Sequence, residues 1–249
     1  MPTSRNARAC YPGMLLGGML AALPTTARVE VAVGGHVTAT TDYVLRGMSQ
    51  TRGAPALQAD LHFEHTSGWF GGAWGSTIDL NRGPGATLEL NAYAGRNWQI
   101  DPAWSARATA VHYAYPNDTE FLRYDYDELI GSLAFRDRLV ASVAWSPNTA
   151  RYANYGGAQE GTSRTYDLVG HWPLTGSLTA TVGVGYYELD DLFDTGYGYW
   201  NAGLAWTLPH LQVEFGWYST TDQAEDLFGS ETTGQRWSLT ATWQFQLLD

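Results

Sequence analysis

The chain has 249 residues, of which 16% are charged and 14% are aromatic, with 28 glycines. The charged fraction is well below the roughly 25% of soluble domains, so charges are too few to cover a water-exposed surface generously. The formal net charge of -11 argues against a nucleic-acid partner, and the single cysteine, Cys10, excludes an internal disulfide.

The N-terminal segment has the composition of a secretory signal peptide. Arg5 and Arg8 precede an apolar run over 14–23, and small residues follow up to Ala27. This order is typical of a cleaved export signal. The alternative is a short membrane anchor, but the run is about half the roughly 20 residues that a spanning helix needs. We therefore expect a signal peptide over 1–27 and one exported domain over 28–249.

Apolar and polar residues alternate from Val29 onward, and no long segment has helical periodicity. In the last such segment, apolar residues from Trp237 to Leu247 alternate with polar ones from Arg236 to Gln246. Because successive side chains of a strand point to opposite faces, the pattern predicts strands with one apolar and one polar face. Twelve strands are expected, two of them ambiguous in phase (69–78 and 104–115) and the others at 29–40, 57–64, 88–94, 128–135, 139–145, 166–172, 178–186, 200–207, 211–217 and 236–247.

The connections alternate between tight turns and longer loops. The tight turns are 65–68, 99–103, 136–138, 173–176 and 208–210, and the longer loops are 44–56, 79–86, 116–123, 146–162, 188–196 and 219–234. A soluble up-and-down barrel would turn its polar face to water, and nothing would place its long loops at one end. Short turns at one rim and long loops at the other are typical of bacterial outer-membrane barrels, which close because lipid tolerates no open sheet edge. The predicted fold is all-β: a transmembrane antiparallel up-and-down β-barrel of about 12 strands in the bacterial outer membrane.

Several tryptophans support this interpretation. They occupy the apolar face at or near strand ends, where an indole can rest at the lipid headgroups: Trp145, Trp172, Trp206, Trp217 and Trp243. The alternative is a β-sandwich core filled with tryptophan, which would need partners for many buried indole N–H groups.

Residues 41–51, TDYVLRGMSQT, are followed by PALQ at 55–58 and GWFGGAWGS at 68–76. This stretch resembles the opening of the TorF-type porin family of proteobacteria. The positions that match are Asp42, Tyr43, Arg46, Gly47, Ser49, Gln50 and Thr51. The resemblance implies an outer-membrane barrel assigned as a porin, with no known substrate. Many outer-membrane barrels end on an aromatic residue, whereas this chain ends on Asp249, which leaves open how the barrel-assembly machinery reads the last strand.

Arg46 has two possible roles. It could fold inward as a constriction element and pair with a lumen carboxylate such as Asp42. Alternatively, a local pair between Arg46 and Asp42 fixes the loop on the barrel rim. The sequence favours the local pair, because flexible glycines beside an Asp-Arg pair require no transported solute.

If the apolar face touches lipid and lipopolysaccharide, the polar face lines a lumen in which carboxylates outnumber fixed cations. The residues expected to set selectivity are Glu30, Asp60, Glu64, Glu89, Glu128, Asp167, Glu214 and Arg236. Acids in a narrow pore attract cations, so we predict passive diffusion of small hydrophilic solutes with cation preference and with no cofactor or metal site. The alternative is a plugged barrel with a binding, adhesive or structural role at the surface, because side chains can fill a small barrel.

An enzymatic function is the alternative to a channel. Ser67 lies near His62 and His65, but the chain contains no HExxH, P-loop or CxxC motif, and Gly47-Met-Ser49 lacks the second glycine of a nucleophile elbow. We predict no catalytic residue and no enzymatic activity.

Overall fold

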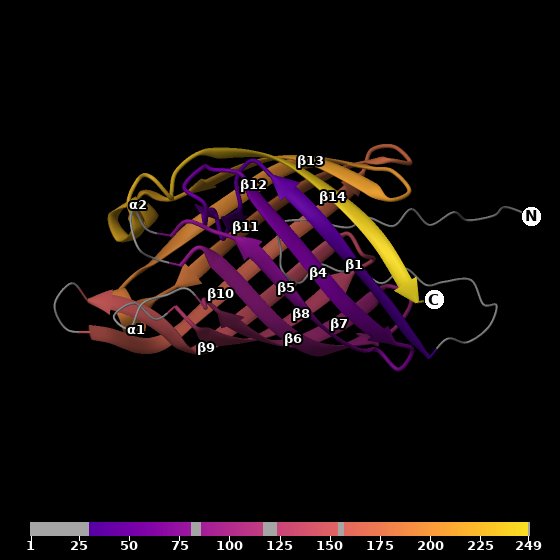
Figure 1. The fold of residues 1–249 in the computed structure, drawn as a ribbon, viewed down its shortest axis with the longest axis horizontal. Helices are drawn as coiled ribbons and strands as arrows, with labels where there is room; N and C mark the ends of the chain where they lie inside the picture. The colour runs from indigo at the N-terminus through magenta and orange to yellow at the C-terminus, as the bar shows by residue number, and fades with distance from the viewer. Residues whose placement is uncertain (1–29, 81–85, 117–123, 154–156, 249) are drawn as a thin grey trace, which may run out of the picture.

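The computed structural model describes residues 30–80, 86–116, 124–153 and 157–248, and the predicted signal peptide lies outside them. Twelve antiparallel strands form a closed barrel in which each strand pairs with its neighbours in the chain and β14 pairs with β1 (Figure 1). The barrel strands are β1 Val31–Thr40, β4 Ala56–His65, β5 Trp69–Thr77, β6 Leu88–Gln99, β7 Trp104–Ala114, β8 Tyr126–Phe135, β9 Leu139–Ala153, β10 Gly157–Pro173, β11 Leu178–Glu188, β12 Gly196–Thr207, β13 Leu211–Thr220 and β14 Arg236–Leu248. The predicted strand count and topology are confirmed.

The seam between β1 and β14 shows how the barrel closes. Thr38 faces Thr242 with their hydroxyls 2.9 Å apart, and Thr40 faces Thr240 at 2.8 Å. These inward hydroxyls pair across the seam while the outward positions remain apolar. Closure removes the unpaired strand edges that an open sheet would present to lipid.

The two ends of the barrel differ. At the end that we call the turn end, β14 ends and short turns join the strands at 66–68, 100–103, 136–138, 174–177 and 208–210. At the opposite end, the loop end, lie the hairpin of β2 Val44–Leu45 and β3 Met48–Ser49, and the short helices α1 Asp190–Phe193 and α2 Asp222–Phe228. Neither helix of the described part of the chain is long and apolar enough to cross a membrane.

One predicted loop is largely strand. We expected a connection over 146–162, but β9 continues to Ala153 and β10 begins at Gly157, with an irregularity in register between Gly161 and Ser163. Residues 146–162 do not alternate clearly between apolar and polar, so the sequence did not predict strands there. Backbone pairing between β9 and β10 nevertheless continues into this polar part of the hairpin.

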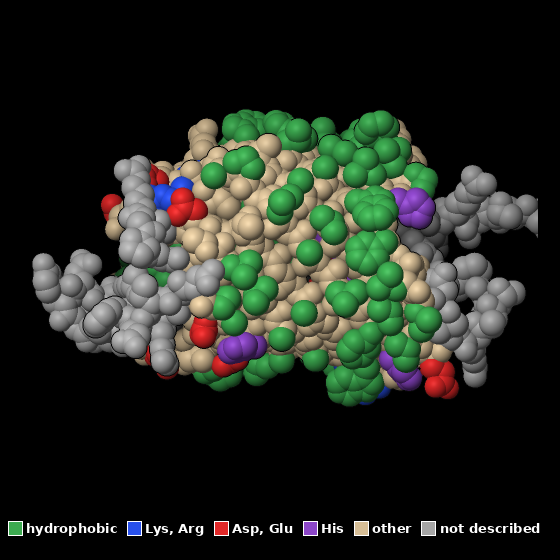
Figure 2. All heavy atoms as spheres, viewed as in Figure 1, with side chains coloured by type: hydrophobic (Ala, Val, Ile, Leu, Met, Phe, Trp, Pro, Cys, Tyr) green, Lys and Arg blue, Asp and Glu red, His purple; other side chains and the backbone are tan. Residues whose placement is uncertain are grey.

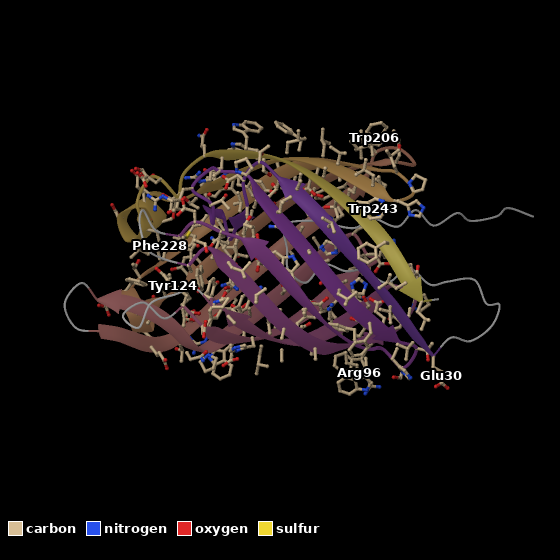
Figure 3. The ribbon with its side chains drawn as sticks, in the orientation of Figure 1. Glu30, Arg96, Tyr124, Trp206, Phe228 and Trp243 are labelled. Carbon is tan, nitrogen blue, oxygen red and sulfur yellow. The ribbon has the colours of Figure 1, made fainter. Side chains whose placement is uncertain are left out.

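The exterior of the barrel is apolar. Leu57 is 63% exposed, Val184 is 52% exposed and Leu168 is 44% exposed. On the face shown in Figure 2, hydrophobic side chains are spread over the barrel wall, most densely toward the turn end, and acidic side chains lie toward its ends. Trp206 and Trp243 point outward near the turn end, as predicted (Figure 3). An exposed apolar surface of this extent, with aromatic residues near its border, is typical of contact with lipid.

The two strands of ambiguous phase are resolved. In β5, Trp69 faces outward and is 54% exposed, whereas Trp74 faces inward and is 7% exposed. In β7, alanines face outward while Arg107, Thr109 and Val111 face inward. The outward glycines and alanines of these strands give little hydrophobic contrast, so the sequence alone did not separate the faces.

Candidate functional site

The loop over 41–55, which we call the inner loop, folds into the barrel. Its tip is the tight turn at Arg46 and Gly47 between β2 and β3, where both residues have positive φ, 51° and 77°. Two positive φ values match a type I′ hairpin turn, which favours glycine. Gly47 also packs closely on the wall, since a Cβ there would lie 2.7 Å from Cγ2 of Thr220 and 2.8 Å from Cβ of Tyr199.

Asp42 organises the base of the inner loop. Its Oδ1 accepts hydrogen bonds from the hydroxyls of Ser49, at 2.5 Å, and Thr51, at 2.9 Å. Nη1 of Arg236 lies 3.5 Å from its Oδ2, which ties the loop to the start of β14. The Ser49 hydroxyl in turn accepts the backbone N–H of Gly53 at 2.9 Å. These contacts account for the spacing of the polar residues in the 41–51 segment.

Arg46 reaches across the lumen to β8. Its Nη2 lies 2.5 Å from Oε1 of Glu128, and the two side chains are 11% and 1% exposed. The guanidinium also lies 4.6 Å from the ring of Tyr187 on β11, and the Tyr113 hydroxyl donates to Oε2 of Glu128 at 3.1 Å. Burial opposes the charge of Arg46, but Glu128 and the hydroxyls of Tyr187, Tyr126 and Tyr113 together outweigh it, and the pKa of the guanidinium is raised well above its usual value. Arg46 therefore stays charged.

The predicted pair between Arg46 and Asp42 is wrong. Arg46 binds Glu128, and Asp42 binds Ser49, Thr51 and Arg236. The tight turn carries Arg46 to the tip of the hairpin, away from Asp42 at its base. The structure places Arg46 inward, as in the other predicted arrangement, but with Glu128 as its partner.

Further contacts hold the inner loop across the lumen. Its Ser49 N–H donates to the Thr232 carbonyl at 2.7 Å, and its Arg46 carbonyl accepts from the Tyr197 hydroxyl at 3.2 Å. Two apolar clusters flank it near the loop end, where Tyr124 and Phe228 are labelled in Figure 3. One cluster is centred on Tyr43, Ala56, Trp74, Ile78, Ala86, Val111, Tyr113 and Tyr115, and the other on Leu189, Leu192, Tyr197, Tyr199 and Ala224. The inner loop and these clusters lie in the half of the barrel nearest the loop end.

The other predicted selectivity residues fall in three places. On the inner wall, Asp60, Glu89 and Glu128 are buried, while Glu64, Asp167 and Glu214 are partly exposed. Arg236 lies at the loop end and also donates to the Thr232 carbonyl. Glu30 precedes β1 and is exposed at the turn end (Figure 3). The role of these residues in selectivity stays a prediction.

The contacts among the lumen residues around Asp60 and the inward position of Arg107 were not predicted. Asp60 is the centre of a polar cluster, with Nδ1 of His62 at 2.5 Å, the Tyr93 hydroxyl at 2.7 Å and Nδ1 of His36 at 3.8 Å. Arg107 projects inward from β7, with its guanidinium 3.8 Å from the ring of Phe70. The alternation of Ser105, Arg107 and Thr109 with alanines was the signal in the sequence that could have placed Arg107.

His65 and His112 lie outside the lumen, and neither forms a hydrolytic triad with other described residues. His65 contacts Ser67 at 2.6 Å in an exposed turn, and no carboxylate of the described chain bonds to its ring. His112 bonds Asp127 at 2.8 Å on the outer face. The shallow hollow beside it is lined by Ala92, Tyr93, Ala94, Ala110, Val111, Glu128, Leu129, Trp145 and Pro147, a set without serine, threonine or cysteine. Over the same described ranges, no group of three or more His, Cys, Asp or Glu side chains could hold a metal ion.

Comparison with known proteins gives a family and a fold. A family model described as "Bacterial protein of unknown function (Gcw_chp)" matches residues 24–248, and no curated protein matches. The NanC porin is similar with a TM-score of 0.56 and 11% identity, covering 87% of this chain and 99% of that chain. The KdgM porin has a TM-score of 0.52 and 7% identity, covering 86% and 99%. A KdgM structure described as a complex with disordered oligogalacturonate has a TM-score of 0.50 and 8% identity, with the same coverage. At these identities the likeness shows a shared closed β-barrel fold.

Proposed function

The chain belongs to the Gcw_chp family, and we propose that it acts as an outer-membrane porin-like channel for passive diffusion of small hydrophilic solutes, with preference for cations. The porin fold and the apolar exterior support a place in the outer membrane. The turn end would face the periplasm, as in barrels with short periplasmic turns. Export would use the predicted signal peptide, and the TorF-type resemblance supports the same assignment.

The inner loop is the observation that carries this proposal. A surface loop has no need to enter a barrel, yet this one crosses the lumen and ends on a charged pair with the opposite wall. In a channel, such a loop narrows the path and places charges where a solute must pass. Selection would then depend on the width and charge beside Arg46 and Glu128.

The charges of the lumen favour cations over polyanions. Inward carboxylates on β4, β6, β8, β10 and β13 outnumber the inward arginines Arg46, Arg107 and Arg236: they are Asp60, Glu64, Glu89, Glu128, Asp167 and Glu214. Oligogalacturonate, which is named with KdgM, is itself a chain of carboxylates. We therefore expect this lumen to pass small cations and neutral solutes better than such anions.

Reconstitution of the purified protein in planar bilayers tests the proposal. Discrete conductance steps with a cation-selective reversal potential would support the channel. Silence from protein that keeps heat-modifiable folding would instead favour a plugged barrel with a surface role, which the two apolar clusters at the loop end would also fit. Release of fatty acids from phospholipid would contradict the absence of enzymatic activity.

A further inference from the structure

Glu89, at the start of β6, is a buried carboxylate without a compensating cation. Its side chain faces the lumen and is 0% exposed. Other buried carboxylates have cationic or ionisable partners, since Glu128 pairs with Arg46, Asp42 with Arg236 and Asp60 with His62. In the described chain, no arginine, lysine or histidine forms an ion pair with Glu89. A buried charge without a partner is costly, so something must neutralise it.

The hydrogen bonds around Glu89 are also incomplete. Asn91 donates Nδ2 to Oε1 of Glu89 at 2.7 Å, which leaves Oδ1 of Asn91 buried with no hydrogen bond and Oε2 of Glu89 with none of good geometry. The Tyr43 hydroxyl of the inner loop is buried beside the Glu89 carboxyl, to which it makes a hydrogen bond of poor geometry. Burial raises the pKa of Tyr43 well above its usual value, and the nearby Glu89 carboxyl raises it further. Buried polar groups are nearly always satisfied, so the open oxygen of Asn91, together with the poorly bonded carboxyl of Glu89 and hydroxyl of Tyr43, indicates an occupant.

We propose that Glu89, Asn91 and Tyr43 form a binding site for one partly dehydrated monovalent cation beneath the inner loop. The three side chains offer oxygen atoms and a single formal negative charge. A monovalent cation would neutralise that charge, whereas calcium sites draw on six to eight oxygen ligands, often from several carboxylates. A water molecule would satisfy the oxygens but leave the charge.

The site couples the wall of the barrel to the inner loop. Tyr43 lies in the loop, with its ring 5.5 Å from that of Trp74 on β5, while Glu89 and Asn91 belong to β6. A bound cation would therefore hold the loop against this wall, as Arg46 holds its tip against β8. The inference rests on the proposed function, because the cation would enter through the channel. Cation binding is measured in crystals and conduction in bilayers. Failure of the binding site and failure of the channel therefore give different results.

Thallium(I), a heavy monovalent cation, tests the site directly. Crystals of the full chain, grown without sodium or potassium and soaked in a thallium(I) salt, should give an anomalous peak beside Glu89. Glu89→Gln keeps the shape of the side chain but removes its charge, and it should lower thallium affinity at this position by about tenfold or more. The control Glu214→Gln removes another inward carboxylate, on β13, and should leave the peak unchanged.

Two further measurements keep the inference open to contradiction if Glu89→Gln fails to fold. Tyr43→Phe keeps the ring against Trp74 and removes the hydroxyl, and it should weaken thallium binding by a few fold. Infrared spectroscopy of the wild-type protein at neutral pH distinguishes a proton from a cation. The absence of a peak beside Glu89 in the wild type, or a protonated-carboxyl band of the wild-type protein that thallium(I) does not remove, would overturn the site.

Discussion

Arg46 and Glu128 are 82 positions apart in the sequence and meet at 2.5 Å inside the barrel. Arg46 comes from the loop between β1 and β4, and Glu128 from β8, which is separated from β4 in the barrel by β5, β6 and β7. The pair therefore fixes the inner loop across the lumen. Because both side chains are almost fully buried, each depends on the other for neutralisation.

Removing one member of this pair should release the inner loop. Glu128→Gln leaves the Arg46 guanidinium buried without a carboxylate, which typically costs about 3 kcal/mol. We expect proteolysis by thermolysin within 41–55, mapped by mass spectrometry, to accelerate by up to about 100-fold. The control Glu231→Gln weakens the pair with Arg52, in which Glu231 is 40% exposed, and should change cleavage little. Equal cleavage of the two variants would contradict a special role for the Arg46 pair.

Gly47→Ala should loosen the tip of the loop. A side chain at this positive φ costs roughly 1–2 kcal/mol, and the new Cβ would also clash with Thr220 and Tyr199. Gly53→Ala is a matched control, because its φ is 78° but a Cβ there would meet only Nη1 of Arg236, at 3.7 Å. The barrel of both variants should keep its heat-modifiable migration in gels. Thermolysin should cleave the inner loop of the Gly47 variant faster than that of the Gly53 variant, and the reverse order would show that the tip does not pack on the wall.

Asp42→Ala should disorder the base of the loop. The substitution leaves the hydroxyls of Ser49 and Thr51 and the Arg236 guanidinium without their shared acceptor, at a cost of about 1–3 kcal/mol. Hydrogen exchange of the 41–55 amides should accelerate, while exchange in β1 and β4 stays slow. Asp42→Asn retains one acceptor oxygen and should give an intermediate rate. Unchanged exchange in both variants would refute the organising role of Asp42.

A charged side chain in the middle of the lipid-facing wall should destabilise the barrel more than one at its border. Leu168→Arg on β10 places a guanidinium in the apolar band and should lower the free energy of unfolding in lipid vesicles by about 2–4 kcal/mol. Leu208→Arg makes the same change in a turn, at the border of the barrel, and should cost about 0–1 kcal/mol. Urea titrations with tryptophan fluorescence measure both values. A soluble protein would show no such dependence on depth.

The barrel could be predicted from the sequence because each strand shows its two faces through its own alternation of apolar and polar residues. In the segment from Trp237 to Leu247, for example, this alternation identifies the lipid-facing side without information from any other strand. Where the outward residues are glycine or alanine, as around Trp74 and Arg107, that local evidence is weak and the phase stayed ambiguous. The polar hairpin beyond Trp145 was not predicted, because its strands pair without an alternation of apolar and polar residues.

The path of the inner loop was less predictable than the strands. Its polar residues were recognised as a set, but the partner of Arg46 is fixed by the curvature of the closed sheet, which brings β8 opposite the β1–β4 connection. No pattern within 41–55 encodes that distance. Both Arg46 and Glu128 were named from the sequence, but Arg46 was paired with Asp42 instead of Glu128.

Single-channel recording of Arg46→Ala/Glu128→Ala in planar bilayers tests the central claim, that the inner loop sets the width of the lumen. The double variant removes both charges together and avoids an orphaned buried ion. We expect a larger unitary conductance than that of the wild type, with weaker discrimination between cations and anions, while Arg52→Ala conducts as the wild type does. A double variant with wild-type conductance and selectivity would contradict the account.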